Sequence, residues 1–571
     1  MSFIMNNKVA NKLFEIADLL ELKGSQFKPR AYRRAAQNIV NSSTDIIESY
    51  ENDKLQEIEG VGESIASKVR EIIETGSLEY LEDLRKQFPE GLQEMMDIQG
   101  LGPKSLMKLY KELNIKNIEE LEKAAKNKKI REIEGFGEKS EKNILKNINM
   151  YKKFQERFLL GNILPIAKKI ESKLSELEEV ERINLAGSIR RMKETIGDVD
   201  ILIISTNPDK VMDYFTGLEE VERVVSKGHT RSTIITANKL SIDLRVVEAK
   251  SYGSALQYFT GSKEHNIKLR SIALDKNWKL SEYGLIDKDS MDTIASEQEK
   301  DIYSSLELDY IEPELREDRG EIEAAREGKL PQLIKIEDIQ GDLHIHTKWS
   351  EGSNSIEEMA QAAKKKGYKY LAICDHAETL QVASGLTSEE IRTQMKEINQ
   401  VNKNIEGITI LSGIEANIDS EGNIDVKKKI LKDLDVVLAS VHSGFKSSEK
   451  KMTDRIINAM HNDYIHILGH PTGRMLNKRE PYSVNLKKVF EAAEDLGIIL
   501  EINAFPERLD LNDVNCKNAK NYDLLMCINT DSHHVEHLRF MEYGIATARR
   551  GWLEPKNVAN TLDLKELRKL L

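Results

Sequence analysis

The chain has 571 residues, of which 40% are hydrophobic and 32% charged, and its net charge at pH 7 is −12. This length accommodates three or four domains of roughly 150 residues each. The acidic balance argues against a protein that coats nucleic acid with a basic surface, and no segment approaches the roughly 20 apolar residues of a membrane span. The three cysteines are scattered, so we expect a reducing, cytoplasmic location, and any metal must be held by His, Asp and Glu.

The first 150 residues contain one pattern three times, in 58-IEGVGESIASKV-69, 98-IQGLGPKSLMKL-109 and 133-IEGFGEKSEKNI-144. In each copy two glycines flank an apolar residue, and apolar residues then recur at helical spacing. The glycines permit a tight turn, and the amides that open the second helix face outward, ready for a phosphate. The pattern resembles helix-hairpin-helix elements, which hold DNA backbones without reading sequence. The resemblance implies DNA contacts at six glycines: Gly60, Gly62, Gly100, Gly102, Gly135 and Gly137.

Residues 156–320 change character, with β-rich runs expected at 199-VDILIIS-205, 233-TIITANKLSIDLRVV-247 and 257-QYFTG-261 among helices. Asp198 and Asp200 are one residue apart on a predicted strand, so both carboxylates point to one face. Asp243 lies on another strand-like run. Three such carboxylates suit two Mg²⁺ ions that activate an attacking oxygen and stabilise a leaving pyrophosphate. A solvated strand face is the alternative.

Gly187 and Ser188 precede these aspartates, as in the nucleotidyltransferase superfamily, and 258-YFTGSKEHNIKLR-270 narrows the resemblance to family X DNA polymerases, the DNA polymerase beta family. With 31-AYRRAAQNI-39 and 311-IEPELRE-317, it covers residues 1 to about 320. It implies that Asp198, Asp200 and Asp243 bind the catalytic Mg²⁺ ions. It also implies a nucleotide site in which Arg157, Ser188, Arg191 and Gly197 hold the triphosphate, Tyr258, Phe259 and Gly261 line the sugar, and Asn266 and Arg270 contact the base and the template. For Tyr258 and Phe259, an aromatic core pair is the alternative.

Two positions call for comment within this resemblance. Lys68 aligns with the lysine that forms a Schiff base with 5′-deoxyribose phosphate in the family's lyase members, a role that requires a lowered pKa. An ordinary lysine on an exposed helix face is the alternative. Met192 departs from the family, which usually has Gly after the two arginines, and this affects the geometry expected for the triphosphate loop.

From about residue 336, short apolar runs alternate with helical stretches, beginning at 341-GDLHIH, 369-KYLAICDH, 408-ITILSGIEA, 435-DVVLASVHS, 464-YIHILGH, 498-IILEINA and 524-LLMCINTDSHH. This alternation predicts parallel strands joined by helices, as in a β/α barrel or a doubly wound sheet. Most of the ten histidines after residue 340 follow these runs, and barrel enzymes build their sites at the carboxyl ends of strands. The candidate ligands are His344, His346, Glu351, His376, Glu415, His442, His470, Asp531 and His533.

The ligand pattern resembles the PHP (polymerase and histidinol phosphatase) domain, a distorted seven-stranded β/α barrel that binds up to three metal ions for phosphoester hydrolysis. The resemblance implies a 3′-5′ exonuclease, with endonuclease action at abasic sites or 3′-phosphatase action as further options. Imidazole and carboxylate ligands favour Mn²⁺ or Zn²⁺. At Glu351 the chain has S-E-G where the PHP pattern usually has S-D-G. We therefore expect the third metal to bind more weakly than in S-D-G proteins.

Together these features predict a multidomain protein. Its expected units are a helical DNA-binding, lyase-like domain (1–90), a fingers-like helical domain (91–155), an α+β nucleotidyltransferase palm with its nucleotide-binding subdomain (156–320), a linker (321–337) and a (β/α)7 PHP barrel (338–571). The leading hypothesis is a monomeric DNA repair polymerase that fills short gaps in primer-template DNA with dNTPs and trims 3′ ends. A DNA-gap-binding scaffold and a PHP small-molecule phosphatase are the alternatives.

Overall fold

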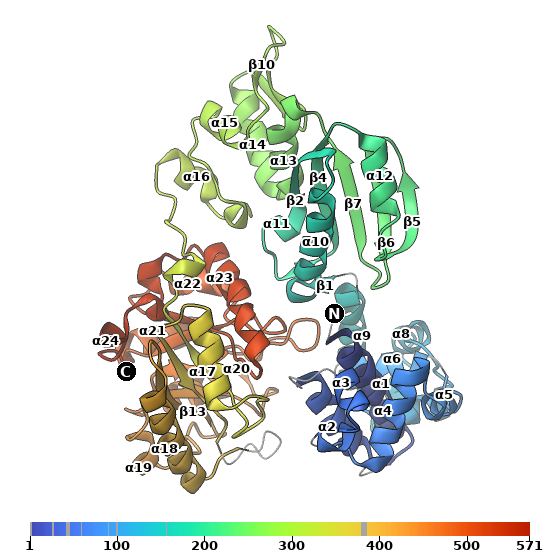
Figure 1. The fold of residues 1–571 in the computed structure, drawn as a ribbon, viewed down its shortest axis with the longest axis vertical. Coiled ribbons are helices and arrows are strands. Elements are labelled where there is room, and N and C mark those ends of the chain that lie inside the picture. Colours follow the sequence, from blue (N-terminus) through green and yellow to red (C-terminus); the bar gives the residue numbers. More distant parts are fainter. Residues whose placement is uncertain are drawn as a thin grey trace.

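The computed structural model describes residues 3–571 except 26–27, 42–45, 59, 90, 99–100, 156 and 378–384. Figure 1 shows a helical unit at the N-terminal end, an α/β region in the middle and a barrel at the C-terminal end, the multidomain arrangement expected from sequence. Within the described residues, every helix is too short or too polar to cross a membrane.

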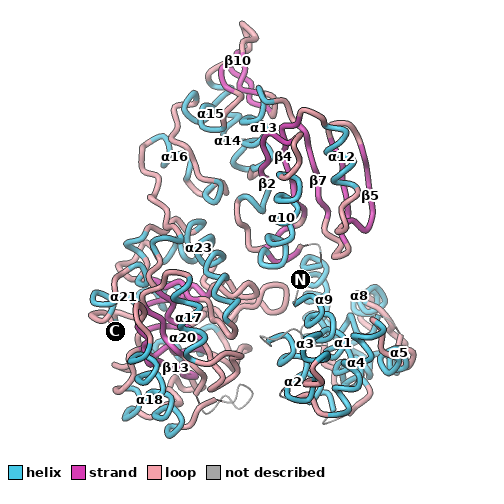
Figure 2. The backbone as a smooth tube through the Cα atoms, viewed as in Figure 1, coloured by secondary structure: helices cyan, strands magenta, loops and turns pink. Residues whose placement is uncertain are grey.

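The N-terminal unit consists of helices packed around one core, which Figure 2 shows as helix throughout apart from its connecting loops. Its α-helices are α1 (Phe3–Leu22), α2 (Lys28–Asn41), α3 (Ile46–Glu51), α4 (Glu63–Thr75), α5 (Glu79–Arg85), α6 (Gly91–Glu94), α7 (Pro103–Leu113), α8 (Ile118–Lys126) and α9 (Glu138–Gln155). The helices that follow the glycine pairs bury one apolar face each: α4, for example, buries Ile65, Val69 and Ile72 at helical spacing.

The three glycine repeats have the same flanking elements. A short 3-10 helix at Leu55–Glu57, Met95–Asp97 or Ile130–Glu132 comes first, and α4, α7 or α9 begins a few residues later. Gly60 and Gly135 open the turns with φ of +81° and +85°, a backbone conformation that favours glycine. Gly100, the equivalent residue of the second repeat, lies outside the described residues. The predicted helix-turn-helix pattern is therefore confirmed in the first and third copies and, from Leu101 onward, in the second.

The palm region is built on a five-stranded sheet of order β2-β4-β7-β6-β5. Its elements are β1 (Phe158–Leu159), α10 (Leu160–Ser175), β2 (Val180–Ala186), α11 (Gly187–Arg190), β3 (Thr195–Ile196), β4 (Asp198–Ser205), α12 (Pro208–Thr216), β5 (Val221–Lys227), β6 (Arg231–Thr236) and β7 (Ser241–Val246). Alternate residues of β4 face opposite ways, as the period of a strand requires. Ile201 and Ile203 pack with α10 and α12, whereas Leu202 packs on the other face with Tyr252 and Leu256.

A smaller subdomain follows the sheet. It contains α13 (Tyr252–Thr260), α14 (Lys263–Asp275), a three-stranded sheet of β8 (Trp278–Ser281), β9 (Gly284–Asp287) and β10 (Thr293–Ala295), then α15 (Glu299–Ser305) and α16 (Glu321–Arg326). The expectation of a β-rich run at 257–261 is wrong, because these residues form the end of α13. Burial of Tyr252, Ala255 and Leu256 on one side of that helix outweighs the β preference of its aromatic residues, and the helix ends at Gly261, whose φ is +69°.

The C-terminal region is a seven-stranded parallel sheet of order β11 to β17. Its strands are β11 (Gly341–Ile345), β12 (Tyr370–Ile373), β13 (Thr409–Asn417), β14 (Val436–Ser440), β15 (Ile467–Leu468), β16 (Ile499–Asn503) and β17 (Met526–Asn529). A parallel bridge between Ile345 and Ser532 brings the last strand back to the first, so the sheet curls into a nearly closed barrel. All seven runs predicted from sequence contain strands.

Helices cover the barrel and connect its strands (Figure 1). They are α17 (Ile356–Lys365), α18 (Ser388–Asn404), α19 (Lys428–Leu431), α20 (Glu449–Met460), α21 (Leu486–Leu496), α22 (Asp513–Ala519), α23 (Met541–Arg550) and α24 (Leu564–Leu567). The barrel also packs against the palm: Leu476, Leu509, Phe540 and Tyr543 belong to the same buried cluster as α10 and β4. In the segment expected as a linker, Ile322 is buried with the preceding subdomain and Ile334 with the barrel.

Candidate metal centres and nucleotide site

The three palm aspartates lie where the register of two strands brings them together. β4 and β7 are parallel, and Asp200 is the direct partner of Asp243. Asp198 and Asp200 share the face of β4 that carries Leu202, which packs against α13. Burial, followed by the negative charge of Asp198, raises the pKa of Asp200 to about 6. The mutual repulsion of these carboxylates is the electrostatic condition that a divalent cation relieves.

Two neighbours fix the shape of this site. Gly187 has φ of +66°, and a Cβ built on it would lie 2.9 Å from Oδ2 of Asp200, so only glycine fits beside the carboxylate. The carboxylate of Asp243 accepts hydrogen bonds from Arg231, at 2.8 Å, and from the hydroxyl of Thr233. Among the described residues, groups of three ligand atoms within 4.8 Å of one another occur in the barrel and not at these aspartates. Arg231 and Thr233 thus hold the Asp243 carboxylate in its present orientation.

The residues expected to hold the nucleotide triphosphate come from the segments before and between the first strands of the palm. Gly187 and Ser188 open α11, Arg191 follows it, and Gly197 immediately precedes β4. Nε of Arg157 donates to Oγ1 of Thr195 at 2.9 Å. The buried Arg191 donates through Nη1 to the carbonyl of Thr260 and through Nε to Glu317, 3.0 Å away. Met192, the departure from the family, has φ of +50°, the conformation for which the family's glycine is suited.

The remaining nucleotide-site candidates lie on α13 and α14. The rings of Tyr258 and Phe259 meet edge to face with centroids 5.2 Å apart, and the guanidinium of Arg245 lies 4.5 Å over the ring of Phe259. Asn266 donates to the carbonyl of Tyr258 at 2.8 Å and accepts from Gln257, which orients its amide. Gly261 ends α13, and Arg270 is half-buried on α14. Both aromatic side chains are half-buried, and Phe259 packs against the buried cluster of Tyr252 and Leu256.

Lys68 lies on α4, directly after the first hairpin. Its ammonium donates to the carbonyl of Ser64 at 3.0 Å and lies 4.9 Å over the ring of Tyr80. Burial and the positive charge of Lys28 lower the pKa of Lys68, against an opposing effect of Glu71. The sequence had offered no group that would lower this pKa, because Lys28 lies 40 residues away along the chain and approaches only in the folded unit.

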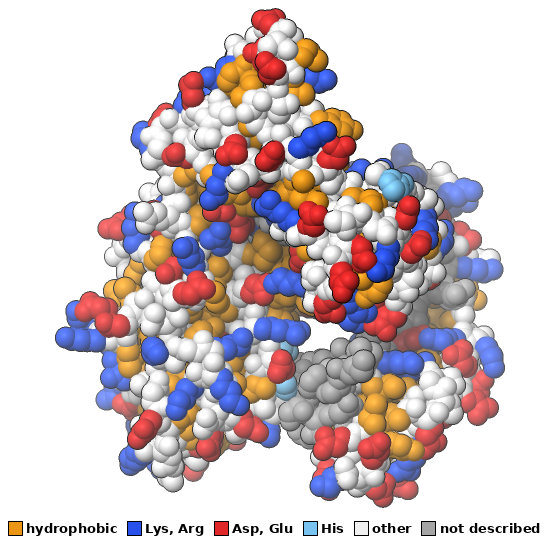
Figure 3. Space-filling view, turned by 45° about the horizontal axis from the view of Figure 1, so that its top comes forward, with side chains coloured by type: hydrophobic (Ala, Val, Ile, Leu, Met, Phe, Trp, Pro, Cys, Tyr) orange, Lys and Arg blue, Asp and Glu red, His pale blue; other side chains and the backbone are white. Residues whose placement is uncertain are grey.

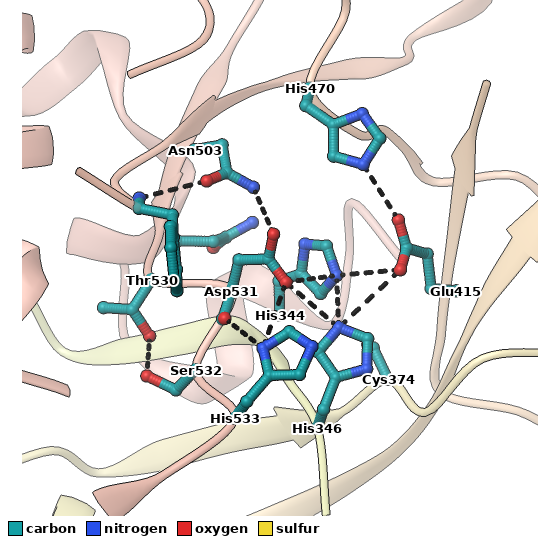
Figure 4. Close-up of polar contacts among 12 residues, drawn as sticks. His344, His346, Cys374, Glu415, His470, Asn503, Thr530, Asp531, Ser532 and His533 are labelled. Atoms are coloured by element: carbon teal, nitrogen blue, oxygen red, sulfur yellow. Dashed lines mark hydrogen bonds and ion pairs between the residues drawn. The ribbon is translucent and has the colours of Figure 1, made fainter. Parts of the chain in front are cut away.

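In the barrel, all nine predicted ligands converge in one cluster, part of which Figure 4 shows. Nε2 of His344 and Nε2 of His346 lie 3.0 Å apart, and Oδ1 of Asp531 lies 3.1 Å from the latter nitrogen. Two imidazole nitrogens and a carboxylate oxygen directed at one point are the donor set that Mn²⁺ and Zn²⁺ prefer. The backbone of Asp531 has φ of +54°, strain of the kind that concentrates at functional sites.

Glu415 stands at the centre of the cluster and faces histidines from several strands (Figure 4). Its Oε1 lies 3.2 Å from Nε2 of His442 and 3.1 Å from Nε2 of His470, while its Oε2 lies 2.9 Å from Nδ1 of His376. Although burial alone would raise the pKa of Glu415, the charges of His376 and His442 hold it well below the ordinary value. A single buried carboxylate thus contacts most of the imidazoles.

Glu351 reaches the cluster despite its extra methylene. Its Oε1 lies 3.0 Å from Nε2 of His376 and 2.8 Å from Nε2 of His533, and its side chain is 40% exposed, more than the other ligands. Three groups of residues could each hold an ion: His346, His376 and His533; His344, His346 and Asp531; His376, Glu415 and His442. These buried groups indicate metal sites. Whether the third ion binds weakly stays a prediction.

Sequence reasoning missed Glu501, which is fully buried at β16. Its Oε1 lies 2.7 Å from Nδ1 of His344 and accepts from Asn529, while its Oε2 accepts from the backbone amide of His470, 2.7 Å away, and from Asn503. A carboxylate fits here because every neighbour is a donor. The interaction sets the orientation of His344, so that Nε2 faces Asp531 and His346. The signal was a carboxylate inside the apolar run 498-IILEINA.

Taken together, a nucleotidyltransferase-type carboxylate set and a histidine-rich barrel define a two-centre phosphoester enzyme with DNA-binding hairpins. Comparison with protein families agrees: residues 4–78 match a helix-hairpin-helix domain, 92–149 a SAM-like helix-hairpin-helix tandem, 255–317 the DNA polymerase beta thumb and 342–505 the PHP domain. The chain is 37% identical over 571 residues to the DNA polymerase/3′-5′ exonuclease PolX of Bacillus subtilis, covering 99% of both proteins. The chain therefore belongs to the PolX family.

The chain also has shorter relatives that match part of its length. Over 241 residues, 40% of this chain and 93% of the relative, it is 31% identical to a probable phosphatase of Thermoanaerobacter sp.. Over 167 residues, 28% of this chain and 61% of the relative, it is 36% identical to a probable phosphatase of Caldanaerobacter subterraneus.

Proposed function

We propose that this PolX protein fills short gaps in DNA with the palm aspartates and trims 3′ ends with the barrel cluster. One observation carries the proposal: the chain contains two separate sets of candidate metal ligands. Asp198, Asp200 and Asp243 lie on paired strands of the palm sheet, and the nine-residue cluster lies in the barrel. Since every assigned residue comes from one chain, we propose that a monomer suffices.

DNA is held through the hairpins. Gly62 and Gly102 cap the N-termini of α4 and α7, and Gly137 immediately precedes α9. A Cβ on any of these three glycines would meet no atom within 4 Å, so a phosphate can approach the backbone amides. Contacts of this kind are independent of sequence, which suits a primer-template with a gap of any sequence.

In the palm, Mg²⁺ would be held by Asp198, Asp200 and Asp243 and would activate the primer 3′-oxygen and stabilise the departing pyrophosphate. The chain's own residues supply the rest. Arg157, Ser188, Arg191 and Gly197 form the triphosphate site, and Tyr258, Phe259 and Gly261 bound the sugar. Asn266 and Arg270 face the base and template. The edge-to-face rings of Tyr258 and Phe259 give that boundary the bulk to reject a ribose 2′-hydroxyl.

In the barrel, Mn²⁺ or Zn²⁺ would be held by the three ligand groups, one of which includes Glu415, and would supply Lewis-acid chemistry for phosphoester hydrolysis. Glu501 holds His344 in orientation, and Asp375 fixes the loop that carries Glu351 by accepting from the amide and hydroxyl of Thr347 at 2.7 and 2.6 Å. Mn²⁺ is our choice over Zn²⁺ for nuclease activity because carboxylates make up a third of the ligands.

A 5′-labelled primer on a one-nucleotide gap tests this assignment. With dNTPs and Mg²⁺ we expect extension, and with Mn²⁺ alone we expect 3′ shortening. Asp243→Ala should abolish extension and preserve shortening, and His344→Ala should do the reverse. Asp213→Ala and His461→Ala, at exposed positions of the same two regions, serve as matched controls. Loss of both activities in either single variant, with the protein still folded, contradicts two separate centres.

The similarity of the barrel to probable phosphatases supports a second activity, hydrolysis of phosphate monoesters. A DNA 3′-phosphate and p-nitrophenyl phosphate, assayed with Mn²⁺, distinguish the two substrate classes. Faster release from the DNA 3′-phosphate supports a repair role, because only that substrate engages the hairpins. Equal rates favour a general phosphatase, which was the alternative at the outset.

A further inference from the structure

Two side chains of the barrel donate hydrogen bonds to the backbone of the two arginines assigned to the nucleotide triphosphate. Nδ2 of Asn477, in the loop after β15, donates to the carbonyl of Arg157 at 2.9 Å. Nη1 of Arg550, the last residue of α23, donates to the carbonyl of Arg191 at 2.7 Å. These contacts cross between regions that are 320 and 359 residues apart in sequence. In Figure 1, α23 lies on the side of the barrel nearest the palm.

Arg550 also reaches the side chain of Arg191 through a shared carboxylate. Oε1 of Glu317 accepts from Nη1 of Arg550 and from Nε of Arg191, at 3.0 Å in each case. The second guanidinium branch of Arg550 donates to Oδ2 of Asp513 at 2.7 Å, so the barrel's own α22 anchors it. Arg550 is only 4% exposed. Charged groups held together at this depth interact strongly, and their geometry is correspondingly restricted.

The segment that Arg550 contacts, Arg191–Met192, has a strained backbone conformation. Met192 follows Arg191 and has φ of +50°, which is unfavourable for a residue with a side chain. The hydrogen bond from Arg550 to the carbonyl of Arg191 fixes the peptide that joins these two residues. Glu317 then directs Nε of Arg191, and the carbonyl of Thr260 accepts from Nη1. Hydrogen bonds thereby fix both the backbone and the side chain of Arg191, and the bond to the backbone comes directly from the barrel.

We propose that Arg550 and Asn477 are positioning residues of the polymerase reaction, through which the PHP barrel shapes the triphosphate site of the palm. The proposal rests on the proposed function, in which Arg157 and Arg191 bind the triphosphate. Arg550 serves a second purpose as well: its charge competes for Glu317. Without it, Glu317 neutralises Arg191 more completely and the site attracts the triphosphate less.

The test is steady-state kinetics of single-nucleotide gap filling with the full-length protein. We expect Arg550→Gln to raise KM for the dNTP about tenfold and to change kcat by about twofold or less, because the aspartates on β4 and β7 are untouched. Arg550→Lys keeps the charge and one donor and should recover most of the loss. Arg549→Gln is the matched control: Arg549 also crosses to the polymerase region, at Glu314, without contacting Arg157 or Arg191.

Mn²⁺-dependent 3′ shortening, measured on the same preparations, reports whether the barrel is intact. If Arg550→Gln loses this activity too, Asn477→Gly decides, since glycine tolerates the φ of +58° at this position and removes only the donor. A wild-type KM in Asn477→Gly, or in a nuclease-active Arg550→Gln, overturns the proposal. Arg191→Gln distinguishes failure of this proposal from failure of the proposed function. If Arg191→Gln leaves KM for the dNTP unchanged while the wild type extends primers, the assignment of Arg191 to the triphosphate site is wrong.

Discussion

Gly187→Ala should disable the palm centre through a single methyl group. At φ of +66° an alanine is strained by about 1–2 kcal/mol, the cost of a left-handed conformation for a residue with a Cβ. The new Cβ would also lie 2.9 Å from Oδ2 of Asp200, closer than van der Waals contact allows, so the carboxylate must move by several tenths of an ångström. Displacement of a metal ligand on this scale should lower the rate of primer extension roughly 10- to 100-fold.

A second variant, Gly497→Ala, separates the effect of backbone strain from the effect of moving Asp200. Gly497→Ala, at the end of α21, introduces nearly the same backbone strain at φ of +70°, and its Cβ meets no atom within 4 Å. Both variants should lower stability in urea denaturation by a similar amount, and only Gly187→Ala should slow extension, while 3′ shortening continues in both. Equal extension rates for Gly187→Ala and wild type would show that Asp200 does not need its present position. The reasoning from close packing would then be wrong.

Three further outcomes are expected. Glu501→Gln puts an amide NH₂ next to hydrogen-bond donors whichever way the amide is turned. The Mn²⁺ affinity measured by calorimetry should therefore fall about 10- to 100-fold, while primer extension stays unchanged. An unaltered Mn²⁺ affinity would show that Glu501 does not support the metal site. Glu351→Asp should raise the number of bound Mn²⁺ ions counted by mass spectrometry under limiting metal, and an unchanged count contradicts the weak third site. Borohydride trapping of a 5′-deoxyribose phosphate end needs the neutral amine of Lys68, so its yield should increase with pH around a midpoint below 10.5. Lys28→Gln should move that midpoint upward, because it removes a positive charge near Lys68. A midpoint that does not change in Lys28→Gln refutes the electrostatic argument.

Much of the architecture could be predicted because its signals are local. Barrel strands of two to nine residues and the paired glycines of the hairpins each have their own sequence pattern, and the structure contains the expected elements. Residues 257–261 are an exception to these local signals. Their aromatic residues favour a strand, but burial of one side of α13 stabilises a helix instead. Figure 3 shows acidic and basic side chains interspersed over the visible face.

The chemistry that escaped prediction depends on contacts between distant residues. Glu501 orients His344 from 157 positions away, and Lys28 lowers the pKa of Lys68 from 40 positions away. Arg550 reaches Arg191 across 359 positions. No periodicity or spacing in the sequence encodes such pairings, because they arise only when separate elements pack. The ligands themselves were predictable since each lies within or after a strand, and strands of a barrel deliver their ends to one place.

Glu415 gives the barrel cluster a property that none of its histidines has alone. One carboxylate lies within 3.6 Å of imidazoles from different ligand groups, so its two oxygens cannot be oriented independently. An ion that fixes one oxygen thereby decides where the other points. Ion binding at His376, Glu415 and His442 should consequently affect the neighbouring group at His344 and His346, and the nuclease should switch on over a narrower range of free Mn²⁺ than independent sites would allow.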